Sequence, residues 1–423
     1  MTRVRLAAGE TFASLRNRNF RLFFVGQTIS QVGNWLTLIT QTLLVLNLTH
    51  SGTALGMLTA AQFAPVLVLG PFAGLVADRS DKRRLLVITQ ALAMLQSFAL
   101  AAVAVLDRPP VSAIFAIALV GGVVTAFDNP ARRSFVVEMV PVEQVNNAVS
   151  LNSALMTGSR VVGPALAGLL VVTVGFAWTF AADGISYVAV IAGLVMMRSS
   201  ELRPAPIVEK AKGQVREGIA YARSMPVLWV PLVMMAIVGT FAFNFSVTFP
   251  VFVTRTLHGT ESTFTILFSW LSVGSLLGAL AVARRPATSV RFVALSSVAF
   301  GVSMVGAAIA PSEAVVFVIA PIVGAASIAF MTSSTAIVQT ESDPSMRGRV
   351  LALQSMVFLG STPIGGPIVG WVTEHLGARF GLGLGAVACL AAGAWGVATV
   401  RNGATPQPQP PTGDTSAVLA AST

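Results

Sequence analysis

The stretch Gly74-Leu-Val-Ala-Asp78-Arg79-Ser-Asp-Lys82-Arg83-Arg84 connects two long apolar segments, at residues 53–77 and 85–106. Each segment is long enough to cross a bilayer as a helix, which takes about 20 apolar residues. A run of charged residues between two such helices marks a loop at a membrane surface. The stretch therefore predicts a helical membrane protein.

The composition of the whole chain agrees with this prediction. The 423 residues are 54% apolar and 10% charged, and the mean hydropathy is +0.78. A soluble domain carries about 25% charged residues, so the chain has too few charges for a water-exposed surface. Hydropathy predicts twelve spans, at residues 22–46, 53–77, 85–106, 112–127, 147–174, 176–197, 227–254, 262–283, 292–310, 314–336, 350–373 and 380–400.

The net charge of +10 follows the predicted topology. With twelve spans both termini lie on one side, and the loops and tails of that side hold 23 Lys and Arg, against 3 on the other side. This asymmetry predicts cytoplasmic termini in a multi-pass protein of the cytoplasmic (inner) membrane. A nucleic-acid partner is not needed to explain the positive charge.

Several classes of chemistry are excluded or disfavoured. The single Cys389 allows no disulfide framework, the three His residues are scattered, and no phosphate-binding G-x-x-x-x-G-K-[ST] loop occurs. We therefore expect no metal, no cofactor and no ATP hydrolysis within the chain. Glu374 and His375 are the only adjacent acid–base pair, so catalysis is not expected.

Loops divide the chain into five parts. We predict an amphipathic cytoplasmic N-terminus (1–21), a six-helix half (22–197), a cytoplasmic linker (198–226), a second six-helix half (227–400) and a disordered tail (401–423). The halves resemble degenerate copies, because Glu138-x-x-Pro141 and Gly163-Pro164 recur 203 residues later as Glu341-x-x-Pro344 and Gly366-Pro367. The predicted fold is all-α, with two pseudo-symmetric six-helix halves around a central cavity.

Several motifs of the sequence resemble those of a known protein family. The stretch from Gly74 to Arg84 resembles the G-x-x-x-D-R-x-G-R-[RK] loop of the major facilitator superfamily, with Asp81 in place of the usual Gly. Further motifs resemble its exporter branch, which includes enterobactin exporters and Tap-type and macrolide efflux pumps; they are LRNRNFRL at 15–22, NPAR at 129–132, GPALAG at 163–168 and RGR at 347–349. The resemblance covers residues 15–400.

The resemblance assigns a gating role to the loop. Asp78, with Arg79, Arg83 and Gly74, would form a latch that stabilises the state closed to the cytoplasm. A carboxylate at a helix end pairs with arginines or a helix N-terminus of the other half in only one arrangement of the halves. A solvated loop that only enforces topology is the alternative.

Small residues in the fifth span predict close helix packing. They are Gly158, Gly163, Pro164 and Gly168, and Gly366 and Pro367 repeat the pattern in the eleventh span. Glycines let helices approach closely, and a proline removes a backbone donor and kinks the helix. The set resembles an antiporter motif, although ordinary packing would explain it as well.

Polar residues form stripes on several predicted helices. A polar stripe within a bilayer must face the bundle or an aqueous cavity. The stripes therefore predict cavity-lining residues, with interhelical hydrogen bonding as the alternative; the candidates are Gln27, Gln31, Asn34, Gln41, Ser153, Thr157, Asn244 and Gln354.

Two charged residues remain inside the predicted hydrocarbon, Arg160 and Asp183. Both lie about 20 Å from the cytoplasmic face, by the helical rise per residue, so neighbouring antiparallel helices would bring them together. Asp183 would then carry a proton while Arg160 balances its charge or binds an anionic substrate. A permanent structural ion pair is the alternative. The fourth span (112–127) has no arginine, although many proton-coupled exporters carry one there.

The resemblance implies a secondary active exporter of amphipathic small molecules, such as drugs or siderophore-like compounds, that works by alternating access in exchange for protons. We expect a monomer with a small-molecule substrate, protons as the coupling ion and the lipid bilayer as its surroundings. Uptake or lipid transport by the same fold, and a membrane sensor or scaffold that transports nothing, remain alternatives.

Overall fold

The computed structural model describes residues 12–203, 214–285 and 288–401, and every regular element in these ranges is a helix. The elements are η1 (Ala13–Arg16), α2 (Arg18–Thr49), α3 (Gly52–Arg79), α4 (Lys82–Ala104), α5 (Val111–Glu138), η2 (Val142–Gln144), α6 (Val145–Val195), η3 (Ser199–Glu201), α7 (Gln214–Ser224), α8 (Pro226–Phe241), α9 (Phe245–Val251), η4 (Phe252–Thr256), α10 (Glu261–Ala283), α11 (Val290–Ile309), α12 (Glu313–Glu341), α13 (Pro344–His375) and α14 (Ala378–Arg401).

These helices make the twelve predicted crossings. Eleven helical segments of the described residues are long and apolar enough to cross a membrane, with α8, α9 and η4 together forming one of them. The fifth and sixth predicted spans both belong to α6, whose 51 residues bend at Gly175 (φ 83°, ψ 173°). A straight helix of that length would be about 76 Å long, more than twice the hydrocarbon thickness. Gly175 permits the bend because this backbone conformation strains any residue with a Cβ.

Side-chain caps start several of the helices. The Ser51 hydroxyl accepts a hydrogen bond from the Ala54 N–H at the start of α3, and the Asp81 carboxylate accepts one from the Arg84 N–H at the start of α4. Each cap satisfies a backbone donor that the helix leaves free. Asp81, which departs from the family loop pattern, therefore has a structural role as a cap.

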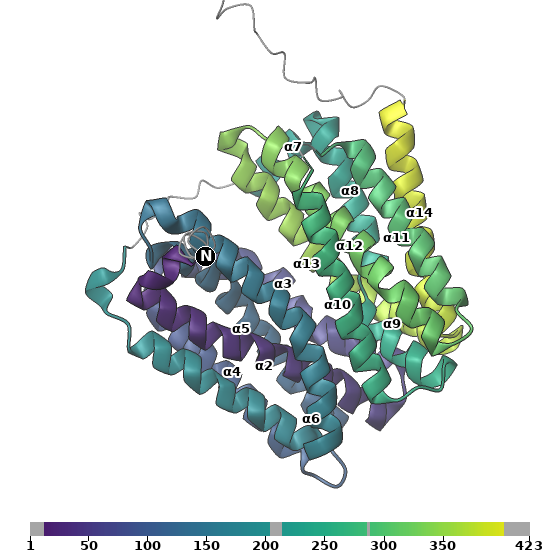
Figure 1. The fold of residues 1–423 in the computed structure, drawn as a ribbon, viewed down its shortest axis with the longest axis horizontal. Coiled ribbons are helices and arrows are strands. Elements are labelled where there is room, and N and C mark those ends of the chain that lie inside the picture. Colours follow the sequence, from purple (N-terminus) through teal and green to yellow (C-terminus); the bar gives the residue numbers. More distant parts are fainter. Residues whose placement is uncertain (1–11, 204–213, 286–287, 402–423) are drawn as a thin grey trace, which may run out of the picture.

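Two helix pairs make most of the contact between the halves (Figure 1). α3 packs against α13, and the first limb of α6 packs against α10. α3 and α10 are the second helices of their halves, whereas the first limb of α6 and α13 are the fifth. The two contacts are therefore related by the pseudo-symmetry that the 203-residue repeat predicts. Glu138 and Glu341, which match in that repeat, end α5 and α12 respectively.

The crossings give the bundle two distinct ends. We call the end where α2 begins and α14 finishes the terminal end, and the opposite end the far end. At the far end a Cβ on Gly56 of α3 would clash with the backbone oxygen of Gly366, and a Cβ on Gly370 of α13 would clash with that of Gly52. Glycine is therefore required where the two backbones meet. In Figure 1 the halves meet near the bend of α6 and lean apart toward α7.

Some helices extend beyond the predicted spans, and the predicted linker contains helices. α2 begins at Arg18, and only the short η1 precedes it in the described part of residues 1–21. The linker 198–226 contains η3 and α7, and its residues 204–213 lie outside the described residues, as does the tail after Arg401. α5 continues eleven residues past the predicted end at Phe127, because its backbone stays helical through Pro130.

Candidate functional site

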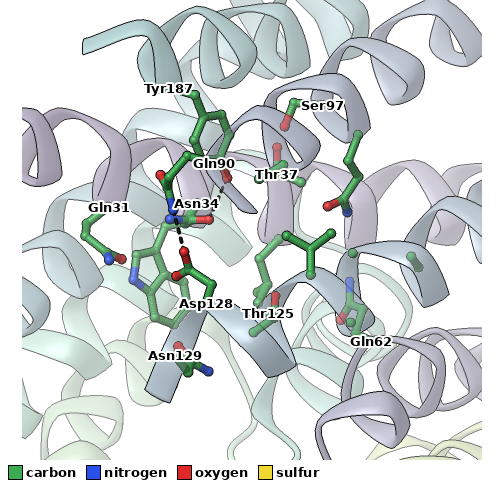
Figure 2. A pocket seen from close by; sticks show the side chains of 18 of the residues that line it. Gln31, Asn34, Thr37, Gln62, Gln90, Ser97, Thr125, Asp128, Asn129 and Tyr187 are labelled. Carbon is green, nitrogen blue, oxygen red and sulfur yellow. Dashed lines mark hydrogen bonds between the residues drawn. The ribbon is translucent and has the colours of Figure 1, made fainter. Parts of the chain in front are cut away.

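A polar cavity of about 280 Å³ lies among the helices of the N-terminal half. Its amide and hydroxyl side chains come from α2, α3, α4, α5 and the second limb of α6 (Figure 2). Trp35 and Met156 add apolar surface. No lining residue comes from the C-terminal half, so this cavity is displaced from the interface of the halves where we expected it.

One wall of the cavity carries a buried ion pair on α5. Arg132 pairs with Asp128 one helical turn away, and Asp128 also accepts hydrogen bonds from Thr89 at 2.9 Å and Gln90 at 2.7 Å. Figure 2 shows Asp128 pointing toward Gln90. The pair removes the net charge of the wall, which leaves the cavity polar but close to neutral.

Sequence reasoning missed this ion pair. We ended the fourth span at Phe127 and noted no arginine in it, yet Arg132 belongs to the same helix. The four-residue spacing of Asp128 and Arg132 fits an ion pair on one helix face and was the available signal. Pro130, which lies between the two residues, argued against a continuous helix, because a proline inside a helix usually marks a break.

Asp183 lies behind the cavity wall, on the second limb of α6. Its side chain is fully buried, and its Oδ2 accepts hydrogen bonds from Thr37 at 2.6 Å and Ser97 at 2.7 Å. Both hydroxyl residues line the cavity. Among the described residues, Oδ1 has a single hydrogen bond, a long one from Ser186 at 3.3 Å. The carboxyl group is thus linked to the cavity through two hydroxyls and keeps one oxygen that is weakly bonded.

Gly33 is the residue that lets α2 approach this carboxyl group. A Cβ at that position would clash with Asp183 Oδ1, so a larger residue would push α2 away from α6. One turn after Asp183 on α6, Tyr187 donates a hydrogen bond to the Asn34 side chain at 2.8 Å, and both residues line the cavity.

The expected ion pair between Arg160 and Asp183 is absent from the salt bridges of the described residues. Asp183 is satisfied by hydroxyls instead, and the Arg160 guanidinium carbon lies 5.7 Å from the centre of the Trp35 ring. Matching depth was a sound inference from helical rise, but depth does not specify which way a side chain points around the helix axis. The ion-pair prediction is therefore wrong for this arrangement, whereas the coupling roles of both residues stay predictions.

The cavity-lining candidates fall into three groups. Gln31, Asn34 and Gln41 line the cavity, and Gln27 lies one turn away, where it accepts a hydrogen bond from Gln31 at 3.2 Å. Ser153 and Thr157 lie on α6 outside the cavity and donate hydrogen bonds to their own helix backbone.

The remaining two candidates, Asn244 and Gln354, are buried in the C-terminal half. Asn244 lies at the break between α8 and α9, and its Nδ2 donates to the Thr240 carbonyl oxygen at 2.7 Å. Gln354 of α13 contacts the hydroxyls of Ser334 and Thr335 of α12, each at 3.2 Å. Hydrogen bonding within this half therefore explains Gln354 and the Asn244 Nδ2, whereas the buried Asn244 Oδ1 has no hydrogen-bond partner among the described residues.

The basic residues at the start of α4 bind within the N-terminal half. Arg83 donates hydrogen bonds to the Leu194 and Val195 carbonyl oxygens, and Lys82 forms a 2.6 Å ion pair with Glu138. Asp78 is half-buried in the last turn of α3, and Arg79 is exposed. Gly74 lies one turn before Asp78. These contacts brace the loop against α5 and α6, and the latch between the halves stays a prediction.

The small residues of α6 serve different neighbours. A Cβ on Gly163 would clash with Trp35, and one on Gly168 would clash with Thr265 of α10, whereas one on Gly158 would meet no atom within 4 Å. Pro164 and Pro367 both lie inside helices. Gly163 and Gly168 therefore fit close packing, and Gly158 does not need to be small in this arrangement.

No cluster of three or more His, Cys, Asp or Glu side chains that could hold a metal ion occurs among the described residues. Cys389 is buried as a free thiol.

Twelve crossings in two pseudo-symmetric halves, with a polar cavity inside the bundle, define a membrane transporter of the major facilitator superfamily. A family model described as transmembrane secretion effector matches residues 9–406, and the chain belongs to this family. This finding confirms the resemblance to the exporter branch. Members of such a family are multi-pass transporters of small molecules in bacterial membranes, not enzymes.

About a quarter of the aligned residues are identical in several relatives. The chain is 25% identical to the Staphyloferrin A transporter of Staphylococcus aureus, over 81% of this chain and 85% of the relative. It is 25% identical to the multidrug efflux pump Tap of Mycolicibacterium fortuitum and 23% identical to macrolide efflux protein A of Streptococcus pyogenes, in each case over 82% of this chain and 87% of the relative.

A solved structure supports the fold. A bacterial homolog to the human lysosomal transporter Spinster, in an inward-facing and occupied conformation, superposes with a TM-score of 0.72 and 14% identity, over 92% of this chain and 98% of that one. At this identity the likeness concerns the fold alone.

Proposed function

We propose that the protein exports amphipathic small molecules, drugs or siderophore-like compounds, from the cytoplasm in exchange for protons. The termini face the cytoplasm, the chain lies in the inner membrane, and it works as a monomer. Relatives described as efflux pumps and as a siderophore transporter support the direction and the range of substrates. The charge asymmetry between the loops supports the orientation.

One observation carries the coupling part of the proposal: the fully buried Asp183 carboxyl group is linked to the cavity by Thr37 and Ser97. An ionisable side chain inside a membrane protein marks a functional site by default, since it is costly to keep there. Oδ2 is occupied by two donors, so Oδ1 is the oxygen that accepts a proton. The Ser186 hydroxyl can then reverse its role and accept the new O–H.

Alternating access is supported by the difference between the two ends of the first limb of α6. Toward the far end the first limb packs at Gly168 against Thr265 of α10. About four to five turns closer to the terminal end, Ser153 of the polar stripe and Ser150, three residues before it, are exposed. The polar stripe is thus open at the terminal end and closed at the far end, as in a transporter that faces the cytoplasm.

The test compares a drug-sensitive bacterial host with and without the protein. We expect the protein to raise drug tolerance and lower ethidium retention, and we expect a protonophore to abolish both effects. The matched control is the Asp183→Asn variant at equal membrane abundance, which should export poorly with or without the protonophore. Unchanged tolerance and retention in the presence of the wild-type protein would contradict export, and export that survives the protonophore would contradict proton coupling.

A further inference from the structure

Arg160 is a cation inside the bundle with no bonding partner in the described part of the chain. Its Nε is shielded from solvent and has no hydrogen-bond partner, and none of the ion pairs between described residues includes it. The buried carboxylates of α5 and of the second limb of α6 are already engaged, Asp128 by Arg132 and Asp183 by hydroxyl groups. The protein therefore does not neutralise this charge itself.

The position of Arg160 connects it to the cavity. Its guanidinium lies over the ring of Trp35, and Trp35 lines the cavity, as does Met156 one turn before Arg160 on α6. Gly163 packs against Trp35 and keeps the ring in place.

The energetics favour an external anion as the missing partner. An unpaired arginine within a membrane helix is unfavourable. A cation–π contact with tryptophan is weaker than that cost, so it leaves the charge only partly compensated. A carboxylate would supply the opposite charge and two acceptor oxygens, which match the planar donors of arginine.

We propose that Arg160, held against Trp35, binds an anionic group of the transported molecule, and that the substrates are amphipathic organic anions such as carboxylates. The inference rests on the proposed transport function and narrows its substrate class. The carboxylate would contact Arg160, and the remaining polar groups of the substrate would bond to amides of the cavity such as Gln31 and Gln62. Arg160 would thus select substrates by charge.

The experiment measures binding and transport separately. Purified full-length protein in lipid nanodiscs is titrated with carboxyfluorescein, an organic anion, and with ethidium, a cation, and binding is followed by fluorescence anisotropy. We expect the wild type to bind carboxyfluorescein at least about tenfold more tightly than it binds ethidium. The affinity of Arg160→Gln for carboxyfluorescein should be about tenfold lower than that of the wild type. The affinity of the variant for ethidium should stay within about twofold of the wild-type value, because ethidium has no anionic group for Arg160 to bind.

Two further variants make the result specific. Arg160→Lys keeps the charge and should recover part of the affinity, and it replaces Arg160→Gln if that variant fails to fold. Arg133→Gln removes an exposed arginine of the same half and should bind like the wild type. Equal affinity of the wild type for both dyes, or carboxyfluorescein affinity unchanged in Arg160→Gln, would overturn the proposal.

Competition identifies the source of the anion. Citrate should displace carboxyfluorescein at concentrations at which chloride does not; displacement by chloride at equal concentration would indicate an inorganic anion site and overturn the substrate class. Everted membrane vesicles, with the same dyes added to the outside and their uptake recorded, test the proposed function on its own. Ethidium transport with no binding or transport of carboxyfluorescein would overturn only the anion site, whereas binding of carboxyfluorescein with no transport of either dye would overturn only the export proposal.

Discussion

The carboxylate of Glu374 accepts a hydrogen bond from the Ser51 hydroxyl at 2.6 Å and thereby ties α13 of one half to the start of α3 in the other. The same oxygen accepts the backbone N–H of Thr53 at 2.9 Å. Both donors belong to the first turn of α3, where a carboxylate also interacts favourably with the helix dipole. This contact closes the far end, next to the glycines at which the two helix backbones meet.

Removal of this contact should open the far end. Hydrogen bonds to a charged group contribute about 1.5–3 kcal/mol each, so Glu374→Ala should shift the equilibrium between closed and open far ends about tenfold or more. The measurement is the labelling rate of Thr59→Cys, a buried position of α3 that faces α13, in a Cys389→Ala background. Asp107→Asn, an exposed change in the loop after α4, is the control. Equal labelling rates in Glu374→Ala and its parent would contradict the role of Glu374.

The glycine contacts of α3 make a second prediction. Gly56→Ala places a Cβ against the backbone oxygen of Gly366, which cannot move without shifting α13. Overpacking of this kind costs about 1–3 kcal/mol, and we expect it to weaken the closed far end and reduce dye transport. Gly70→Ala, on the same helix, adds a Cβ that meets no atom within 4 Å and should transport normally. Similar transport by the two variants would show that the close approach at Gly56 is dispensable.

The ion pair in the cavity should be sensitive to removal of one partner. Arg132→Gln leaves the buried Asp128 with Thr89 and Gln90 as partners but without a counter-charge. Breaking a buried pair in this way typically costs about 3–5 kcal/mol, whereas loss of both charges costs less. In detergent, the double variant Asp128→Asn/Arg132→Gln should therefore have a higher thermal unfolding midpoint than Arg132→Gln. A double variant less stable than Arg132→Gln would mean that Asp128 does not depend on Arg132 for its charge.

The fold could be predicted from the sequence more fully than the site. Apolar length specified the twelve crossings, and the repeat of Glu138 at Glu341 located equivalent helix ends in the two halves. Span length and charge asymmetry report on burial in a bilayer, which dominates the free energy of each helix. These signals are local, so one sequence is sufficient to read them.

The site depends on helix rotation, which the sequence does not specify. Gln31 and Asn34 were found because polar residues at helical spacing must avoid lipid. Trp35, an apolar neighbour on the same helix, gave no such signal although it lines the cavity. Arg160 and Asp183 were matched by depth, yet they face different partners, since Asp183 is bonded to Thr37 and Ser97.

Proton exchange through Asp183 is tested most directly in proteoliposomes that hold a pH-sensitive dye. The drug to which the protein confers tolerance is added to one side with no imposed gradient, and drug flux and internal pH are recorded together for the wild type and for Asp183→Asn. The account predicts that drug entry drives protons outward in the wild type, and that the variant moves neither, or moves the drug with no proton flux. Drug flux in the wild type with a constant internal pH, or proton exchange that persists in Asp183→Asn, would contradict it.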